Sequence, residues 1–106
     1  MTNYYDYEDF EDEEHIDDLS ASVIDLCEQN KFDEADLVCQ KLRDEHDYSV
    51  DGFRMQAIVY EYRGDENNAL EYYKKSLDFM MKNEGYDCDR VEAKIKELKS
   101  KLNTIG

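Results

Sequence analysis

The length, composition and charge of this chain limit the structures and functions open to it. Its 106 residues suffice for one domain, and 41% hydrophobic with 39% charged residues suits amphipathic helices that bury one face. A formal net charge of −15 opposes binding to nucleic acid and anionic membranes and favours basic protein partners. The sequence has no proline and no long apolar run, which predicts helices and no membrane span.

An acidic, aromatic segment opens the chain. Residues 1–18 hold nine acidic side chains and no Lys or Arg, and the repulsion among the acids predicts that 1–16 is a disordered or conditionally ordered tail. Three interpretations remain open: the tail keeps the protein in solution, folds back over the first helix or a groove, or imitates phosphates for a basic partner. Its candidate partner contacts are aromatic: Tyr4, Tyr5, Tyr7 and Phe10.

Helices are predicted along the rest of the chain. Apolar residues recur at helical spacing over about 17–29 and again over about 33–46, where Asp33 can cap the helix start. Ser49 or Asp51 can cap a third helix near 50–62, which ends at a glycine.

A fourth helix is predicted over about 66–82, and a fifth follows the turn at 83–85. Asp89 and Glu92 fit a capping pair at the start of the fifth helix. An apolar stripe on this helix offers a possible homodimer contact, and its residues are Val91, Ile95, Leu98, Leu102 and Ile105.

The chain repeats itself at an offset of 34 residues. The offset pairs Leu19 with Phe53, Val23 with Ala57, Leu26 with Tyr60, Asn30 with Gly64, Ala35 with Ala69, and Cys39 with Tyr73. A period of this length is typical of solenoids, in which each unit buries its apolar face against the next. The apolar residues of the fifth helix match those of the third at an offset of 38, so four extra residues precede it.

The repeat resembles the tetratricopeptide repeat (TPR) family. The segment GDENNALEYYKKSL at 64–77 is similar to that family's turn and second helix, and NKFDEA at 30–35 is similar to the same turn one repeat earlier. The resemblance implies an all-α domain over 17–106, with two TPR-like helix-turn-helix repeats and a C-terminal capping helix.

The resemblance also implies a concave surface, formed by the first helix of each repeat, that binds a protein segment. Matched by position, its residues would be Asp17, Ser20, Ile24, Cys27 and Glu28, then Asp51, Arg54, Ile58, Glu61 and Tyr62, then Glu92, Lys96 and Lys99. The acids favour a partner segment that carries Lys or Arg, with the apolar residues as anchors. Ser20 and Ile24 stand where chaperone-binding family members need Lys and Asn, which disfavours heat-shock chaperones as partners.

No catalytic residue, cofactor or metal site is predicted. His15 and His46 lie in the tail and in a polar turn without an orienting partner, so we expect both to be exposed. Cys27, Cys39 and Cys88 are widely spaced and odd in number, which predicts core thiols instead of disulfides or a zinc site.

Two functions fit these observations. The first is a cytoplasmic, non-enzymatic protein-binding module, an adaptor or small assembly chaperone. The second is an acidic inhibitor, such as an immunity protein or antitoxin, that blocks a basic enzyme or nucleic-acid-binding surface.

Overall fold

Five α-helices make up the described part of the chain. The computed structural model describes residues 15–105, and within this range it contains no strand. The helices are α2 (Ile16–Glu28), α3 (Phe32–Glu45), α4 (Asp51–Arg63), α5 (Glu66–Lys82) and α6 (Asp89–Ile105). The all-α prediction is therefore confirmed, and the predicted bounds of the first four helices lie within one residue of those observed. None of the described helices is long and apolar enough to cross a membrane.

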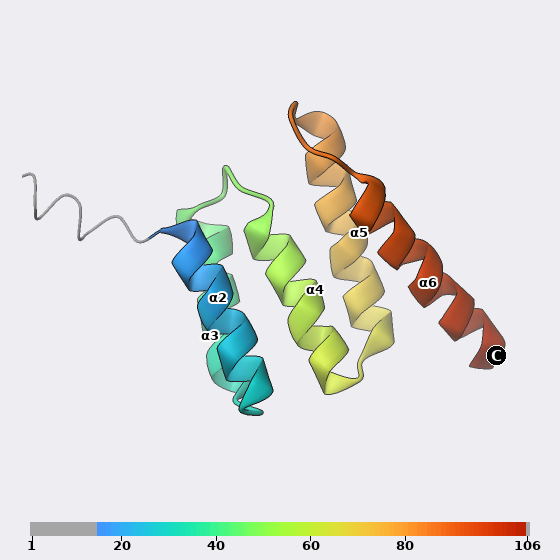
Figure 1. Ribbon diagram of the computed structural model, residues 1–106, viewed down its shortest axis with the longest axis horizontal. Helices are drawn as coiled ribbons and strands as arrows, with labels where there is room; N and C mark the ends of the chain where they lie inside the picture. The colour runs from blue at the N-terminus through green and yellow to red at the C-terminus, as the bar shows by residue number, and fades with distance from the viewer. Residues whose placement is uncertain (1–14, 106) are drawn as a thin grey trace, which may run out of the picture.

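In Figure 1, α2 lies in front of α3, and α4, α5 and α6 follow to the right in the order of the chain. Each helix packs against the next, and α2 also packs directly against α4. The backbones of α4 and α6 do not approach each other in this way: within the described residues the backbone of α6 lies close to that of α5, and α6 reaches α4 through side chains such as Lys94, which pairs with Glu61. In Figure 1, α5 is therefore visible between α4 and α6.

Helix α4 is buried on two sides because it contributes to two hydrophobic cores. Met55 and Val59 of α4 join the first core, and Val50 and Ala57 belong to the second, while Ile58 packs against both. The other buried members of the first core come from α2 and α3: Leu19, Val23, Cys27, Ala35, Cys39 and Leu42. Those of the second core come from α5 and α6: Ala69, Leu70, Tyr73, Met80, Val91, Ile95 and Leu98.

The turns after α2 and α4 have the same backbone hydrogen bonds at an offset of 34 residues. Lys31 N–H donates to Leu26 O and Asp65 N–H donates to Tyr60 O, each over 2.8 Å. Asn30 has φ 62° and its counterpart Gly64 has φ 80°, so both lie in the left-handed region. These residues end their helices in the same way, as expected for Gly and Asn after a helix C-terminus.

The paired alanines occupy equivalent places in the two cores. Ala35 and Ala69 are both 0% exposed, the first in the first core and the second in the second. Since a larger side chain would have no room at either position, these two sites allow the paired helices to approach closely.

The helix starts differ in part from the predicted caps. Helix α3 begins at the residue before Asp33, so Asp33 lies within the first turn. At the start of α4, Ser49 Oγ accepts a hydrogen bond from Asp51 N–H over 3.1 Å, in line with the first of the two predicted caps. Helix α6 begins at Asp89 itself, and its N–H is bound by the side chain of Asp87 over 3.0 Å, so the predicted capping pair is wrong.

A polar network that helical periodicity does not predict joins α3 to α4. Gln56 is only 3% exposed, and its amide accepts a hydrogen bond from Arg43 over 2.6 Å and donates one to Asp36 over 2.8 Å. Arg63 donates to the second oxygen of Asp36 over 2.8 Å. Because its side-chain groups all have partners, the buried Gln56 is compatible with a stable core.

We predict that Gly52→Ala destabilises the protein, although alanine normally favours helix over glycine. A Cβ at position 52 would lie 2.9 Å from the backbone N of Arg43 and 2.7 Å from its Cγ. To relieve this clash, α3 and α4 must move apart, which should lower the free energy of unfolding by about 1–3 kcal/mol. Thermal denaturation followed by circular dichroism measures the effect, and an unchanged or raised Tm would contradict this packing.

Candidate functional site

The predicted partner-binding residues of α2 and α4 meet at a closed seam. Ser20 Oγ donates a hydrogen bond to Asp51 Oδ2 over 3.2 Å, which joins the N-terminal halves of the two helices. Ile24 and Ile58 are half-buried and pack against the first core. The seam therefore offers a partly apolar surface.

The seam between α4 and α6 is open and forms a groove. Two adjoining cavities of about 160 and 260 Å³ lie along it and share Arg54, Arg90 and Val91. We call this feature the α4–α6 groove. Its lower part is also lined by Ile58, Tyr73 and Lys94, and its upper part by Val50, Asp51, Met80, Tyr86 and Asp87.

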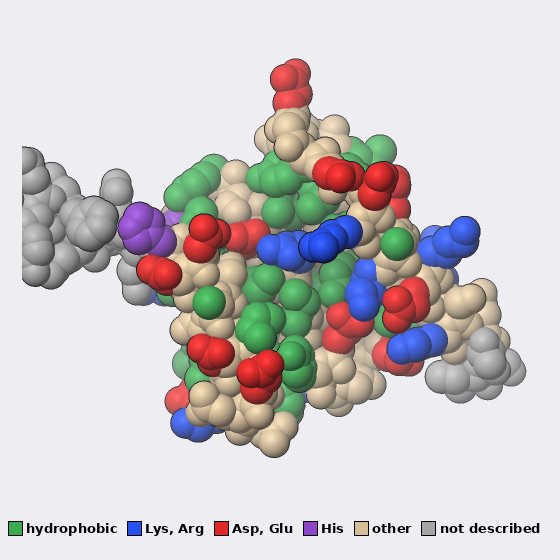
Figure 2. Space-filling view, in the orientation of Figure 1, with side chains coloured by type: hydrophobic (Ala, Val, Ile, Leu, Met, Phe, Trp, Pro, Cys, Tyr) green, Lys and Arg blue, Asp and Glu red, His purple; other side chains and the backbone are tan. Residues whose placement is uncertain are grey.

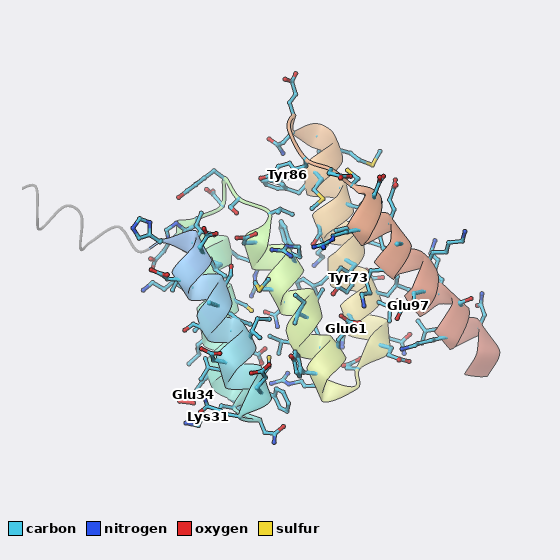
Figure 3. The ribbon with its side chains drawn as sticks, viewed as in Figure 1. Lys31, Glu34, Glu61, Tyr73, Tyr86 and Glu97 are labelled. Atoms are coloured by element: carbon cyan, nitrogen blue, oxygen red, sulfur yellow. The ribbon has the colours of Figure 1, made fainter. Side chains whose placement is uncertain are left out.

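Tyr73 of α5 contributes to the lower part of the groove and is fixed by α4. Its hydroxyl donates a hydrogen bond to Glu61 Oε1 over 2.6 Å, and Glu61 Oε2 lies 3.2 Å from Lys94 Nζ of α6. Burial raises the pKa of Tyr73, and the bond to Glu61 raises it further, so the phenol remains a donor. Figure 3 shows Tyr73 and Glu61 between α4 and α6, with Glu97 on the α6 side.

Three cationic side chains line the groove, and they differ in their partners. Arg54 lies 3.6 Å from Asp51, and Lys94 is paired with Glu61. Arg90 forms no ion pair with any residue of the described chain. A free guanidinium beside apolar surface binds carboxylates well, because it donates two parallel hydrogen bonds.

The side chains of α6 explain why the groove stays open. At the offset of 38, Arg90 and Lys94 of α6 correspond to Gly52 and Gln56 of α4. Gly52 lets α4 approach the backbone of α3 at Arg43, whereas α6 carries long charged side chains at these positions. Arg90 and Lys94 occupy more room than their counterparts on α4, and both line the groove, where Lys94 is paired with Glu61.

Charge is distributed unevenly over this face. Figure 2 shows acidic side chains over α2, basic side chains over the middle of the molecule between α4 and α6, and hydrophobic ones between the two groups. Asp17 and Glu28 are exposed on α2, in contrast to the paired Asp51 and Glu61. The α2 side of this face is therefore acidic, a basic cluster lies over its middle beyond apolar surface, and the α6 side carries both charges.

The predicted contribution of the fifth helix to this face is wrong. Glu92, Lys96 and Lys99 are exposed, but none of them lines the groove. Lys94, on the other side of α6, pairs with Glu61 of α4, and Lys101 on that same side pairs with Glu66 at the start of α5. The positions matched from α2 and α4 lie on the side of each helix that faces the next repeat. Because α6 is the last helix described, the same positions on α6 face no further helix in the described chain.

Two further predicted contacts have other positions, and four lie outside the described residues. Cys27 is 1% exposed and belongs to the first core, so it is not a surface residue. Tyr62 is exposed but lies outside the groove lining. The aromatic residues proposed in the tail, Tyr4, Tyr5, Tyr7 and Phe10, lie outside the described residues.

The apolar stripe on α6 is used inside the molecule. Val91, Ile95 and Leu98 are buried in the second core, and Leu102 packs against it. Four of the five residues in the predicted stripe are therefore used inside the molecule, and the side chain of the fifth, Ile105, lies outside the described ones, so the homodimer stays a prediction.

The histidines and thiols do not form a reactive cluster. His46 is half-buried, in contrast to the prediction, and its Nδ1 lies 3.1 Å from the Tyr48 hydroxyl, while His15 is exposed. Cys27 and Cys39 are buried as predicted, and Cys88 is only half-buried. Within residues 15–105, no group of His, Cys, Asp and Glu side chains is placed to hold a metal ion.

Comparison of the chain with models of protein families, with curated proteins and with solved structures found no match.

We predict that one thiol per chain reacts rapidly with a thiol reagent at pH 8. Burial raises the pKa of Cys27 and raises that of Cys39 to about 12, which removes the reactive thiolates, whereas Cys88 is partly accessible. Absorbance of the released chromophore counts the reacting thiols, and denaturant should expose all of them. Rapid reaction of two or three thiols in the native protein would contradict the described core.

Proposed function

We propose that this chain is a non-enzymatic, TPR-like protein-binding module that holds a segment of one partner on the face formed by α2, α4 and α6. The observation that carries the proposal is the α4–α6 groove, which combines apolar lining from Ile58 and Val91 with Arg90, a side chain that forms no ion pair within residues 15–105. Protein-recognition sites commonly pair apolar contacts with a few charged ones. The equivalent turns and alanines at an offset of 34 support the TPR-like arrangement.

The charge of the face defines the partner segment that fits it. The exposed acids on α2 favour Lys or Arg in the partner segment, as the net charge of the chain does. Arg54 and Arg90 favour a carboxylate in that segment. We propose a segment that carries basic residues on one side, an acidic residue on the other and apolar residues between them. A cytoplasmic location remains part of the proposal and rests on the sequence.

The acidic inhibitor is a second candidate, and the outer face of α3 favours it. Leu37 is 65% exposed on α3, where the exposed Glu34 and Asp44 lie on the same side of the helix, and Tyr48 is 67% exposed beside the exposed Asp47 in the turn that follows. Exposed apolar side chains within a carboxylate-rich surface suit a basic enzyme or a nucleic-acid-binding surface.

We predict that Arg90→Glu weakens partner binding about tenfold or more, whereas Lys96→Glu has little effect. Both positions are exposed on α6 and both variants change the net charge equally, but only Arg90 lines the groove. The experiment is affinity purification with the full-length chain, followed by titration calorimetry of the purified partner against the wild type and both variants.

Equal loss with both variants, or with neither, would contradict the groove as the binding site. A third variant, Glu34→Lys with Asp44→Lys, tests the alternative on the outer face of α3. Loss of binding with this variant alone would favour the acidic inhibitor over the groove-binding module.

A further inference from the structure

A second groove lies on the face of α5 that points away from Tyr73. It has a volume of about 500 Å³, within the range of roughly 300–1,000 Å³ typical of ligand sites. Its lining residues on α5 recur at helical spacing and so share one face: Glu71, Lys74, Lys75, Asp78, Phe79, Lys82. Phe53 of α4 and Asn83 complete the lining. We call it the α5 groove.

Aromatic rings give the α5 groove an apolar centre. The rings of Phe53 and Phe79 lie 6.3 Å apart between centroids, and Phe79 is 6.0 Å from Tyr86 in an edge contact. Phe53 and Phe79 are only half-buried. Rings in such an arrangement favour the addition of another aromatic side chain, because edge and tilted pairs are stabilising.

Lysines at the edge of the α5 groove favour an acidic ligand. Lys74 has no ion pair in the described structure, and Lys75 Nζ lies 4.4 Å from the centroid of the Tyr72 ring. Lys82 is paired only with Asp78, and both side chains are about two-thirds exposed or more (72% and 67%), so this pair is easily exchanged. The fitting ligand is therefore an acidic segment with aromatic side chains.

One segment of this chain has that composition. Residues 4–14 contain four aromatic residues and seven acids and no cation. We propose that this segment docks in the α5 groove of its own chain, with an aromatic side chain against Phe53 and Phe79 and its carboxylates against the lysines.

The position of the segment along the chain is compatible with docking in the same molecule. It ends one residue before His15, at the start of α2, and the bond from Ser20 to Asp51 holds this part of α2 beside the first turn of α4, which carries Phe53. An extended chain spans about 3.3–3.6 Å per residue, so ten residues reach roughly 33–36 Å. This exceeds the length of α5, about 25 Å for its 17 residues.

The α5 groove suits this segment better than the α4–α6 groove does. The cavities of the α4–α6 groove are smaller, at about 160 and 260 Å³, and two of its three cations already have acidic partners. A basic partner would compete with the α5 groove for the same acids, so docking would link partner binding to release of the segment.

Photo-crosslinking of the full-length chain tests the proposal. With p-benzoylphenylalanine in place of Phe10, irradiation followed by mass spectrometry should yield cross-links to the peptides that contain Phe53 or Phe79. Lys74→Glu with Lys75→Glu should lower their yield about fivefold, whereas Lys96→Glu with Lys99→Glu should not, since these lysines lie on α6 outside the groove. The yield should be independent of protein concentration.

A charge exchange distinguishes the loss of cross-links caused by altered charge from a loss caused by misfolding. Glu8→Lys with Asp9→Lys should restore the cross-links in the Lys74→Glu, Lys75→Glu protein, and circular dichroism should show that every variant is folded. Cross-links confined to the α4–α6 groove, cross-links that the lysine variants leave unchanged, or a predominance of cross-linked dimers would each overturn the proposal.

Discussion

The double burial of α4 is the constraint on which the rest of this structure depends. Met55 and Val59 pack into the first core and Ala57 into the second, so one helix of 13 residues holds the two halves of the molecule together. Such a helix cannot keep a wide polar face, and its charged residues are confined to its ends and to one narrow side. Gly52 and the Gln56 network then bring α3 close to α4.

The candidate site follows from the same packing. The backbone of α4 lies close to that of α2 but not to that of α6, which reaches α4 through side chains, so one seam is closed and the other is open. The difference lies in side chains: small or hydrogen-bonded residues stand where α4 meets its predecessors, and Arg90 and Lys94 stand at the matching positions of α6. Tyr73 and Glu61 complete the groove and satisfy each other by a hydrogen bond. The described residues contain no buried side-chain polar atom without a hydrogen-bond partner.

Local features of the sequence predicted the helices well, because helix formation depends on interactions between residues that are close together in the chain. Apolar spacing located all five helices, and Gly64 marks a left-handed turn that Asn30 repeats. The α4–α6 groove was predicted only in part: Arg54 and Ile58 were identified, whereas Arg90 and Lys94 were not. The orientation of α6 relative to α4, like the contact at Gly52, depends on packing between distant segments, which helical periodicity alone does not determine.

Native-state hydrogen exchange tests most directly whether α4 joins both cores into one folding unit. Leu42 and Leu98 are fully buried, one in each core, and truncation of either to alanine should cost about 2–5 kcal/mol. If α4 couples the cores, Leu98→Ala should lower the protection of amides in α2 and α3 as much as in α5, and Leu42→Ala should do the converse. Unchanged protection of α2 and α3 in the Leu98→Ala protein would contradict a shared unit.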